Sequence, residues 1–478
     1  MSTHSQTLSQ PDPKRWKALF LLCFANFLVI MDASIIQIAL PSIQESLGYT
    51  QESLQWVMSA FLLIFGGFLL LGGKLADLYG NRRIFNLGVF ILAVSSLFAG
   101  LAWNEISLNI FRGIQGLGSA LIAPSALSMV MRLFNFSTPE KEKALAFWGL
   151  SGAAGGAFGI VFGGLITGFF GWRWTLFIYV PLSILVLILS PKLLQKSGQR
   201  LKGRIDYVGA ALATASLMLI VYGIVSAEHS GWTSSNVVIS LIVGVVLFLI
   251  FLIVESKMKE ALLPLNIFKT PNLGIGNVGV FLTQAAWFPL IYMLILYLQQ
   301  VLQYSPTAGA MAVLPVPLFM AFFIIVVAEK VLAKLGIKMT MVVGFVILGL
   351  GNILFSQFAT VDGTYVISVL FPSFVAALGN ALAYLASTTA SVSEVEPKKS
   401  GLASGLYNTN FQIGSAIGLA ILVAIAGVAT ASSTAGSQLV ALNEGFQQAF
   451  FWGGIIAFLG AVLALLFTRS PKQEESNR

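Results

Sequence analysis

Apolar runs of about twenty residues recur along almost the whole chain, and this feature limits the possible folds more than any other. Each run is long enough to cross about 30 Å of hydrocarbon as a helix. The runs begin near Lys17, Leu54, Ile84, Ser107, Lys143, Trp174, Asp206, Asn236, Leu273, Pro306, Lys338, Thr364, Ser400 and Gly445. Backbone polar groups in lipid must be satisfied within the protein, which favours helices. We therefore predict an all-α polytopic membrane protein with about fourteen transmembrane helices in contact with the lipid bilayer.

The charged residues support this prediction. They make up 10% of the chain, against about 25% in soluble domains. The net charge of +8 does not indicate a nucleic-acid partner, because the basic residues lie in short loops between apolar runs. In such loops Lys and Arg set membrane topology.

The distribution of basic residues predicts the orientation. With the amino terminus inside, all 27 Lys and Arg residues except Arg112 and Arg173 fall in cytoplasmic segments. Cytoplasmic loops carry the excess of Lys and Arg in membrane proteins. We therefore expect both termini to be cytoplasmic. The first apolar run exceeds the length of a signal-peptide core and lacks a small-residue cleavage site, so we expect it to be a retained helix.

A weak internal repeat predicts the domain organisation. The segment from Gly73 to Arg82 is followed 256 residues later by the segment from Glu329 to Lys338, and both carry a glycine and a following cation. This offset fits two six-helix halves, residues 1–200 and 261–478, separated by a two-helix insert at 201–260. Transporters often form a midplane cavity between such halves. Without the insert, the chain would reduce to two sets of six helices.

The sequence contains no pattern for nucleotide, metal or catalytic chemistry. A Gly-Gly-Lys at 72–74 is followed by Leu75 and lacks the other residues of a phosphate loop. The two histidines, His4 and His229, lie in a tail and a loop. We expect no metal, no cofactor and no enzyme activity. Energy for uphill transport would then come from an ion gradient.

Asp32 and Arg112 are the candidate proton-coupling residues. At about 1.5 Å per residue, Asp32 lies roughly 13 Å from an outer helix end near Pro41, and Arg112 roughly 8 Å from the outer end of the fourth helix. An isolated charge in lipid costs about 3 kcal/mol or more, so both should face the protein interior or a water-filled cavity. Asp32 would exchange a proton while Arg112 tunes its pKa. The alternative is a fixed structural ion pair.

Two glycine-containing segments are candidates for conformational gating. The turn after the second helix contains Gly73, Asp77, Gly80, Arg82 and Arg83. Asp77 opposes the negative end of its own helix and should have a cationic partner, although an ordinary solvated loop is the alternative. In the fifth helix, small residues leave one face open to close approach, which could serve sliding or packing alone. These residues are Gly155, Gly159, Gly163 and Gly164.

Polar and aromatic residues inside other helices are candidates for lining a substrate cavity. Each could instead make an interhelical hydrogen bond or a packing contact. The candidates are Asn26, Gln37, Gln115, Trp287, Tyr297, Asn380, Tyr384, Asn408 and Gln412.

Several motifs, in order along the whole chain, resemble the major facilitator superfamily and its fourteen-helix drug:proton antiporter branch. Three segments carry the resemblance: Met31 to Pro41 in the first helix, the glycine-containing turn from Gly73 to Arg83, and Arg112 to Pro124 in the fourth helix. Gly171 to Trp174 also fits the branch. The antiporter motif of the fifth helix is incomplete, because Ile160 replaces its usual proline.

The resemblance implies a secondary active transporter in a bacterial inner membrane. It would exchange protons for hydrophobic drugs or toxic small molecules by alternating access of the two halves. Some relatives carry acidic residues in the tenth or thirteenth helix, and none occurs here. Monovalent cationic, neutral or zwitterionic amphiphiles are therefore the expected substrates. The alternatives are a dedicated exporter of one metabolite, antibiotic or lipid, and a receptor that has lost transport.

Overall fold

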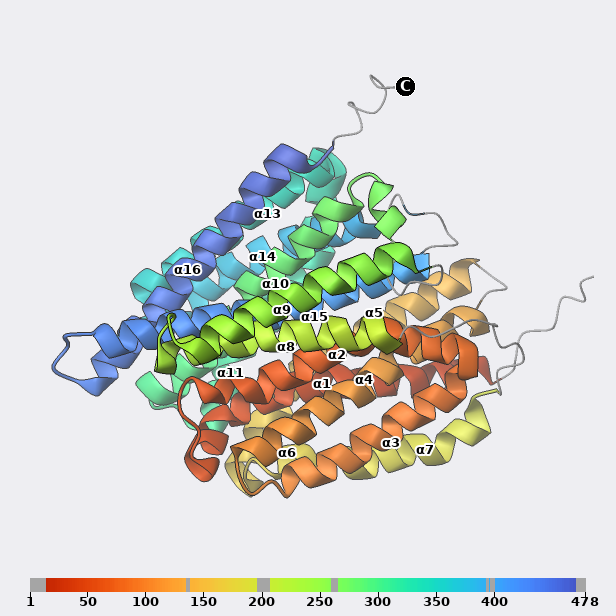
Figure 1. Ribbon diagram of the computed structural model, residues 1–478, viewed down its shortest axis with the longest axis horizontal. Coiled ribbons are helices and arrows are strands. Elements are labelled where there is room, and N and C mark those ends of the chain that lie inside the picture. The colour runs from red at the N-terminus through yellow and green to blue at the C-terminus, as the bar shows by residue number, and fades with distance from the viewer. Residues whose placement is uncertain are drawn as a thin grey trace, which may run out of the picture.

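The computed structural model describes residues 14–134, 138–195, 207–258, 265–392, 395 and 400–469, and this part of the chain is helical with no strand (Figure 1). The first part of the chain forms seven α-helices, the first of them long, and one short 3-10 turn. These are α1 (Arg15–Leu47), η1 (Ser53–Gln55), α2 (Trp56–Tyr79), α3 (Asn81–Gly100), α4 (Glu105–Leu133), α5 (Thr138–Phe170), α6 (Trp174–Phe177) and α7 (Tyr179–Leu193).

A central pair, α8 (Tyr207–Ser230) and α9 (Ser235–Lys257), follows. The remaining elements are η2 (Leu265–Lys269), α10 (Leu273–Leu296), η3 (Tyr297–Val301), α11 (Pro306–Val313), α12 (Pro315–Phe323), η4 (Ile324–Ala328), α13 (Glu329–Phe358), η5 (Tyr365–Leu370), α14 (Phe371–Val392), α15 (Ser400–Ser432) and α16 (Gln438–Phe467). Twelve helices in the described ranges are long and apolar enough to cross a membrane.

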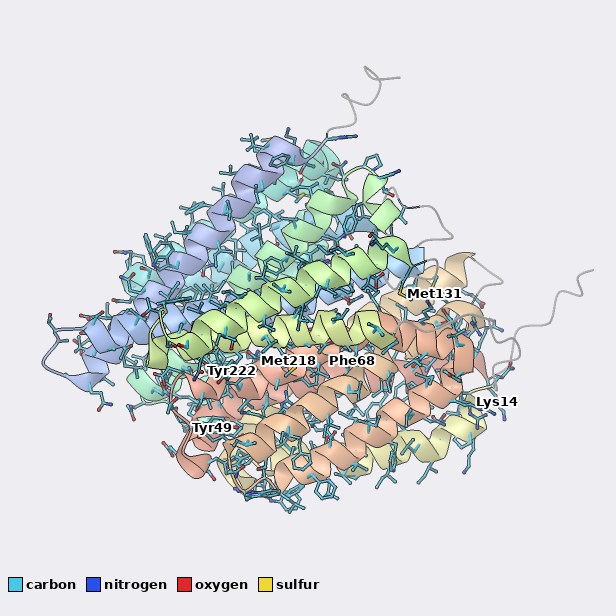
Figure 2. The ribbon with its side chains drawn as sticks, in the orientation of Figure 1. Lys14, Tyr49, Phe68, Met131, Met218 and Tyr222 are labelled. Carbon is cyan, nitrogen blue, oxygen red and sulfur yellow. The ribbon has the colours of Figure 1, made fainter. Side chains whose placement is uncertain are left out.

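The helices pack into two groups beside the central pair. In the first group α1 packs on α5, and α4 packs on α2 and α3; in the second, α13 packs on α14 and α16, and α10 packs on α14, α15 and α16. The central helix α8 packs on α9 and reaches both groups through α2 and α15 (Figure 1). Phe68 of α2 and Met218 of α8 lie against one hydrophobic cluster and are labelled close together in Figure 2.

The predicted repeat recurs in the backbone. Gly80 separates α2 from α3 with φ of 100°, and Gly336 interrupts α13 with φ of 72°. The two glycines are the equivalent positions of the repeat, 256 residues apart. A positive φ favours glycine because a Cβ would be strained there. The chain therefore changes direction at a glycine at both positions.

Two expected helix boundaries are wrong. Helix α1 continues through Pro41 to Leu47 and ends at Gly48, whose φ is 75° and whose N–H donates to the Gln44 carbonyl. A proline is tolerated within a membrane helix when neighbouring groups satisfy the backbone. Helix α16 begins at Gln438, about two turns before Gly445.

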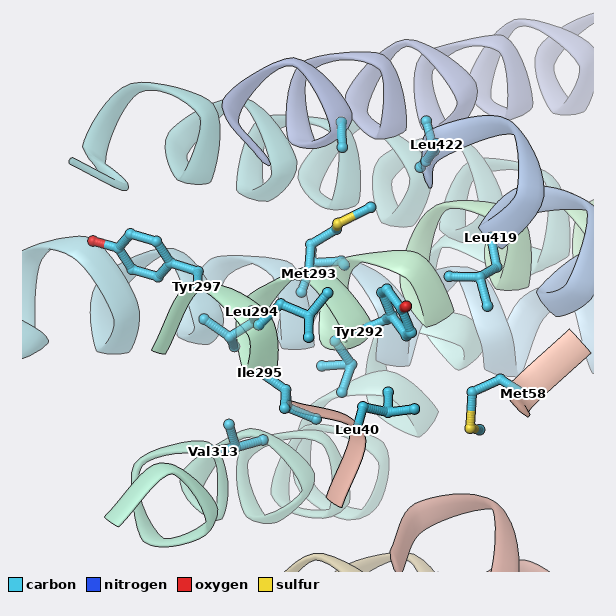
Figure 3. Close-up of a cluster of buried hydrophobic side chains, with 14 of the residues drawn as sticks. Leu40, Met58, Tyr292, Met293, Leu294, Ile295, Tyr297, Val313, Leu419 and Leu422 are labelled. Atoms are coloured by element: carbon cyan, nitrogen blue, oxygen red, sulfur yellow. The ribbon is translucent and has the colours of Figure 1, made fainter. Parts of the chain in front are cut away.

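The two halves are in contact at one end of the bundle and along α2 and α15. That end, here named the distal end, is opposite the Lys14 end of α1 and contains Tyr49 (Figure 2). A single apolar cluster joins both halves there: Leu40 and Met58 belong to the first half, and Ile295 and Val313 to the second (Figure 3). All four side chains are buried. The halves are therefore sealed by apolar contact at the distal end.

The distal loops are also anchored by polar contacts. The Tyr49 hydroxyl lies 2.9 Å from the Glu105 carbonyl and 2.9 Å from Asn109 Oδ1. Burial, with the Glu105 carboxylate nearby, raises the pKa of Tyr49 above its usual value, so the hydroxyl stays protonated at physiological pH. Arg173 stacks on Trp172, with 4.3 Å to the ring centroid, and donates to the Ala102 carbonyl and to Ser46 Oγ.

Candidate functional site

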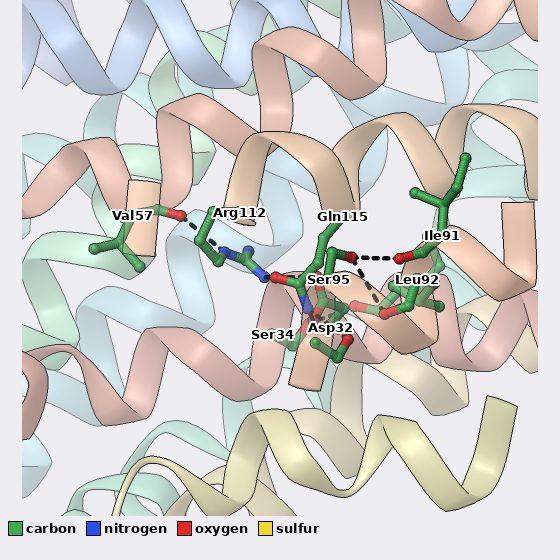
Figure 4. A network of polar contacts seen from close by, with 10 residues as sticks. Asp32, Ser34, Val57, Ile91, Leu92, Ser95, Arg112 and Gln115 are labelled. Atoms are coloured by element: carbon green, nitrogen blue, oxygen red, sulfur yellow. Dashed lines mark hydrogen bonds and ion pairs between the residues drawn. The ribbon is translucent and has the colours of Figure 1, made fainter. Parts of the chain in front are cut away.

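A buried ion pair lies inside the first half. Asp32 projects from the middle of α1 and Arg112 from α4, and Arg112 Nη1 lies 2.7 Å from Asp32 Oδ2 (Figure 4). Both side chains are fully buried. The similar depths predicted for the two residues are thus confirmed by direct contact. A pair out of water is stable only if further hydrogen bonds satisfy its remaining groups.

Neighbouring groups supply those hydrogen bonds. Arg112 Nε donates to the Val57 carbonyl of α2 at 3.0 Å, and Nη1 donates to Gln115 Oε1 at 3.0 Å. The Gln115 amide donates to Ser96 Oγ at 2.7 Å and approaches Asp32 Oδ1 at 3.4 Å. Four helices, α1 to α4, therefore hold the pair in one network (Figure 4).

The guanidinium also has an aromatic neighbour. Arg112 Cζ lies 4.6 Å from the centroid of the Phe61 ring, which attracts a cation through its quadrupole. Arg112 Nη2 makes no hydrogen bond within the described residues. The cation is thus held on one side by Asp32 and on another by groups that do not titrate. If Asp32 takes up a proton, Arg112 keeps its contacts with Val57 and Phe61.

Three residues that share the network with the predicted pair differ in how far the sequence indicates them. Gln115 is one turn from Arg112 on the same helix and was predicted. Ser96 belongs to a polar pair, Ser95 and Ser96, inside an otherwise apolar run of α3, which is a usable but weak signal. The Val57 carbonyl carries no signal in the sequence, because any residue type provides the same oxygen atom.

The glycines of α5 face two different partners. A Cβ on Gly159 would lie 2.9 Å from the Met31 carbonyl oxygen, and one on Gly155 would lie 2.7 Å from the Phe27 carbonyl oxygen. Gly163 approaches α1 in the same way. Gly164, in contrast, contacts Ala310 of the second half. Three glycines therefore position the helix that carries Asp32, and the fourth lies between the halves.

The turn after α2 makes the cationic contact expected of Asp77. Asp77 Oδ1 lies 3.7 Å from Arg132 Nη2 of α4, with both side chains about half exposed. Arg82 donates to the Leu194 carbonyl beyond α7 at 3.0 Å. The close approach between α2 and α4 occurs at Gly72, where a Cβ would meet the Ala120 carbonyl, whereas one on Gly73 would find ordinary contact. Arg83, near the start of α3, is exposed.

Several cavity candidates make hydrogen bonds within their own half of the molecule. Asn26 donates to Ser151 Oγ of α5 at 3.0 Å. Tyr297 donates to the Thr360 carbonyl at 2.7 Å, and Asn408 donates to the Ser404 carbonyl of its own helix at 2.8 Å. Asn26 thus makes an interhelical hydrogen bond, which is the alternative role that was open for it, whereas Asn408 bonds within its own helix.

Other candidates gather between α14 and α15 in the second half. The Tyr384 and Tyr407 hydroxyls are hydrogen-bonded, and both rings lie near Phe411. One turn further along α15, Gln412 is buried against Gly66 of α2. Asn380 donates to Met320 Sδ, while its Oδ1 is buried without a hydrogen bond in the described residues. Gln37 is buried, and Trp287 packs against two apolar clusters.

Polar contacts also join the two halves. Gln299 Nε2 donates to the Ile38 carbonyl at 3.0 Å, and Gln300 Nε2 donates to Gln44 Oε1 at 2.8 Å. Thr307 Oγ1 donates to the Gly164 carbonyl at 3.1 Å. All three donors belong to η3 and α11, and all three acceptors belong to α1 and α5. Together with the apolar cluster, they close the distal end between the halves.

Comparison with known proteins places this arrangement in context. The sequence profile of the Major Facilitator Superfamily matches residues 22–419. The chain is 35% identical over 451 residues to the "Cephamycin export protein CmcT" of Amycolatopsis lactamdurans, covering 94% of this chain and 91% of that protein. It is 33% identical over 462 residues to the "Puromycin resistance protein pur8" of Streptomyces alboniger, covering 96% and 90%.

A solved structure shares the fold. The POT family transporter PepTSo superposes with a TM-score of 0.68 at 17% sequence identity, covering 97% of this chain and 99% of that one. At this identity the match concerns the arrangement of the helices alone.

Proposed function

Because this chain belongs to the Major Facilitator Superfamily, we propose that it exports hydrophobic drugs or related toxic small molecules in exchange for protons. The names of its relatives, an exporter of cephamycin and a puromycin resistance protein, support export of small molecules. An ion gradient would supply the energy for this exchange, and we propose that the ion is the proton.

The buried Asp32–Arg112 pair is the observation that supports proton coupling. Asp32 is a titratable group inside the membrane-spanning region, and such residues mark ion pathways by default. Protonation of Asp32 removes the charge that Arg112 Nη1 faces at 2.7 Å. Arg112 then depends on Val57, Gln115 and Phe61 alone. Protonation of Asp32 would thus change the position of Arg112, and through it the binding of substrate.

Closure at the distal end supports alternating access. The contacts of Gln299, Gln300 and Thr307 with α1 and α5 join the halves at that end. We place the distal end outside the cell and both termini in the cytoplasm, as the basic residues predict. In this orientation the described conformation is closed to the outside. Export requires these contacts to break when the substrate is released.

We also propose fourteen transmembrane helices. The twelve candidate spans include one run from Pro306 to Phe358 of 53 residues, which at 1.5 Å per residue is about 80 Å long. That length exceeds a bilayer, and Gly336 divides the run, so it would contain two spans. Helix α8, with 24 residues and an apolar stretch at Ala211–Ile224, would be the remaining one. The halves and central pair then correspond to residues 1–200, 261–478 and 201–260.

Transport by the purified full-length chain in proteoliposomes tests this function. An imposed pH difference should drive uptake of a lipophilic drug into inside-out oriented vesicles, and each substrate should move protons in the opposite direction. A panel of dyes, antibiotics and metabolites measures how broad the selectivity is. Drug accumulation that is unaffected by collapse of the pH difference would contradict proton exchange.

A dedicated antibiotic exporter is the second candidate. It is favoured by the relative whose name specifies export of cephamycin. It predicts that one chemical class in the panel is transported and that structurally unrelated dyes are not. Transport of several unrelated dyes would instead favour a multidrug exporter.

A further inference from the structure

A cavity outside the ion-pair network opens near the distal end, between the central helix pair and the second half. Its volume is about 950 Å³. One wall is formed by Ile224 of α8 and Trp232 of the α8–α9 turn; the others are formed by α15 and α16. Residues from α1 to α7, including Asp32 and Arg112, do not line it. It is therefore separate from the site proposed for proton coupling.

Polar and apolar residues line different parts of the cavity. On α16, Glu444, Gln448 and Trp452 line it at intervals of four residues, so they form one stripe about 12 Å long on that helix. On α15, the lining begins with Ile421 and ends near the polar Ser432. The cavity thus has an apolar inner part and a polar rim toward the distal end.

Glu444 is the charged side chain among the described lining residues. Its carboxylate is exposed and makes no ion pair or hydrogen bond within the described part of the chain. Trp232 and Trp452, which are 57% and 45% exposed, lie on the two sides of the same cavity. A carboxylate and indole rings are the groups that attract a cation, the first by charge and the second through the ring quadrupole.

The crossing of α15 and α16 lies beside this site. A Cβ on Gly445 would lie 2.6 Å from the Ala426 carbonyl oxygen, so the two helices touch there. Glu444 is the neighbouring residue, and it projects into the cavity instead of the crossing. The contact of α8 with α15 holds Ile224 opposite. The central helix pair thereby completes a wall that the second half cannot form alone.

From this geometry we propose a second small-molecule site, which binds lipophilic monocations. The cation lies at the carboxylate of Glu444 between the rings of Trp232 and Trp452. The apolar part of the molecule lies against Ile224, Ile421 and neighbouring aliphatic side chains. One carboxylate matches one positive charge, and the absence of a basic residue among the described lining residues disfavours an anion. The site is independent of Asp32.

Binding of radiolabelled tetraphenylphosphonium to the purified full-length protein tests the site by equilibrium dialysis. The assay uses the Asp32→Asn variant, so that the central carboxylate does not contribute. We expect saturable binding in this variant. Addition of Glu444→Gln should raise the Kd about tenfold or more, which corresponds to about 1.4 kcal/mol. Glu45→Gln, a change at another exposed distal carboxylate outside the cavity, should leave the Kd unchanged.

A second variant and a second ligand distinguish binding at this site from general effects on folding and from nonspecific hydrophobic binding. Trp232→Leu changes the opposite wall on a different element and should also weaken tetraphenylphosphonium binding. Tetraphenylborate, an anion of the same shape, should not compete. Equal binding by the Glu444→Gln and Glu45→Gln proteins, no saturable binding in Asp32→Asn, or effective competition by tetraphenylborate would each overturn the proposal. The last result would identify an apolar groove that takes lipid.

Discussion

Asp32 and Arg112 depend on each other because both are fully buried. Removing one partner of a buried pair leaves an uncompensated charge and costs about 3–5 kcal/mol, whereas removing both can be nearly neutral. The hydrogen bonds of Arg112 to Val57 and Gln115 offset only part of that cost. The network is therefore less stable with one charge than with both charges or with neither.

This mutual dependence predicts the result of a double-mutant cycle. Arg112→Gln should lower the free energy of unfolding by about 3 kcal/mol or more, since Asp32 loses its partner. Asp32→Asn combined with Arg112→Gln should recover much of that loss. Thermal unfolding of the four proteins in one detergent measures the coupling. Additive effects of the two substitutions would show that the side chains do not form the pair.

The sequence predicted the two charged residues of the network better than it predicted the groups that contact them. Asp32 and Arg112 stood out because charges are scarce in apolar runs, and counting residues placed them at similar depth. The Val57 carbonyl and the Phe61 ring could not be predicted, since backbone oxygens and phenylalanines occur throughout such helices. The role of Glu444 could not be predicted either. It depends on Trp232 and Ile224, which line the same cavity but lie more than two hundred residues away in the sequence.

Helix α5 has a face of glycines that packs closely against α1. Gly155, Gly159 and Gly163 let its backbone contact the backbone of α1 on both sides of Asp32. Small residues permit such close packing in membranes, where lipid removes much of the hydrophobic driving force. The position of Asp32 relative to α4 thus depends on a face of α5 that has almost no side chains.

A matched pair of substitutions in α5 tests this dependence. Gly159→Leu places a side chain where a Cβ would already lie 2.9 Å from the Met31 carbonyl oxygen, and overpacking of this kind typically costs about 1–3 kcal/mol. Gly149→Leu, in the same helix, meets nothing within 4 Å. Transport at equal membrane abundance should fall for Gly159→Leu and remain for Gly149→Leu. Equal transport by the two variants would mean that the close contact is dispensable.

The helices themselves were largely predictable, and their ends were less so. Apolar runs located the spans because lipid imposes the same minimum length on each. The direction change at Gly80 was predicted, and its repeat at Gly336 followed from the sequence offset. The true end of α1 was missed because Pro41 was interpreted as a boundary, while Gly48 ends the helix. Whether a proline interrupts a helix depends on neighbours that the local sequence does not reveal.

The whole molecule is two packed halves in contact at the distal end and along α2 and α15. Gly168 at the end of α5 and Thr307 at the start of α11 belong to different halves, and a Cβ on Gly168 would lie 3.7 Å from Thr307 Cβ. That separation suits a disulfide, whose Cβ atoms are about 3.5–4.5 Å apart. The contact offers a way to hold the distal end closed.

A disulfide at this contact should stop transport reversibly. Gly168→Cys with Thr307→Cys, in a Cys23→Ser background, should cross-link on mild oxidation. Export requires the distal end to open, so the oxidised protein should lose activity and recover it on reduction. Each single cysteine variant, treated in the same way, is the control and should retain transport. Full activity of the cross-linked protein would show that the distal contacts need not separate.

Proton exchange through Asp32 is the central claim, and substrate-linked proton flux measures it most directly. Proteoliposomes with an internal pH dye would contain either the wild-type protein or Asp32→Asn, which keeps nearly the same shape but cannot titrate. On addition of a transported drug, the wild type should move protons and concentrate the drug under an imposed pH difference. Asp32→Asn should bind the drug, move no protons and accumulate nothing. Accumulation by Asp32→Asn at the wild-type rate, driven only by the pH difference, would contradict the claim.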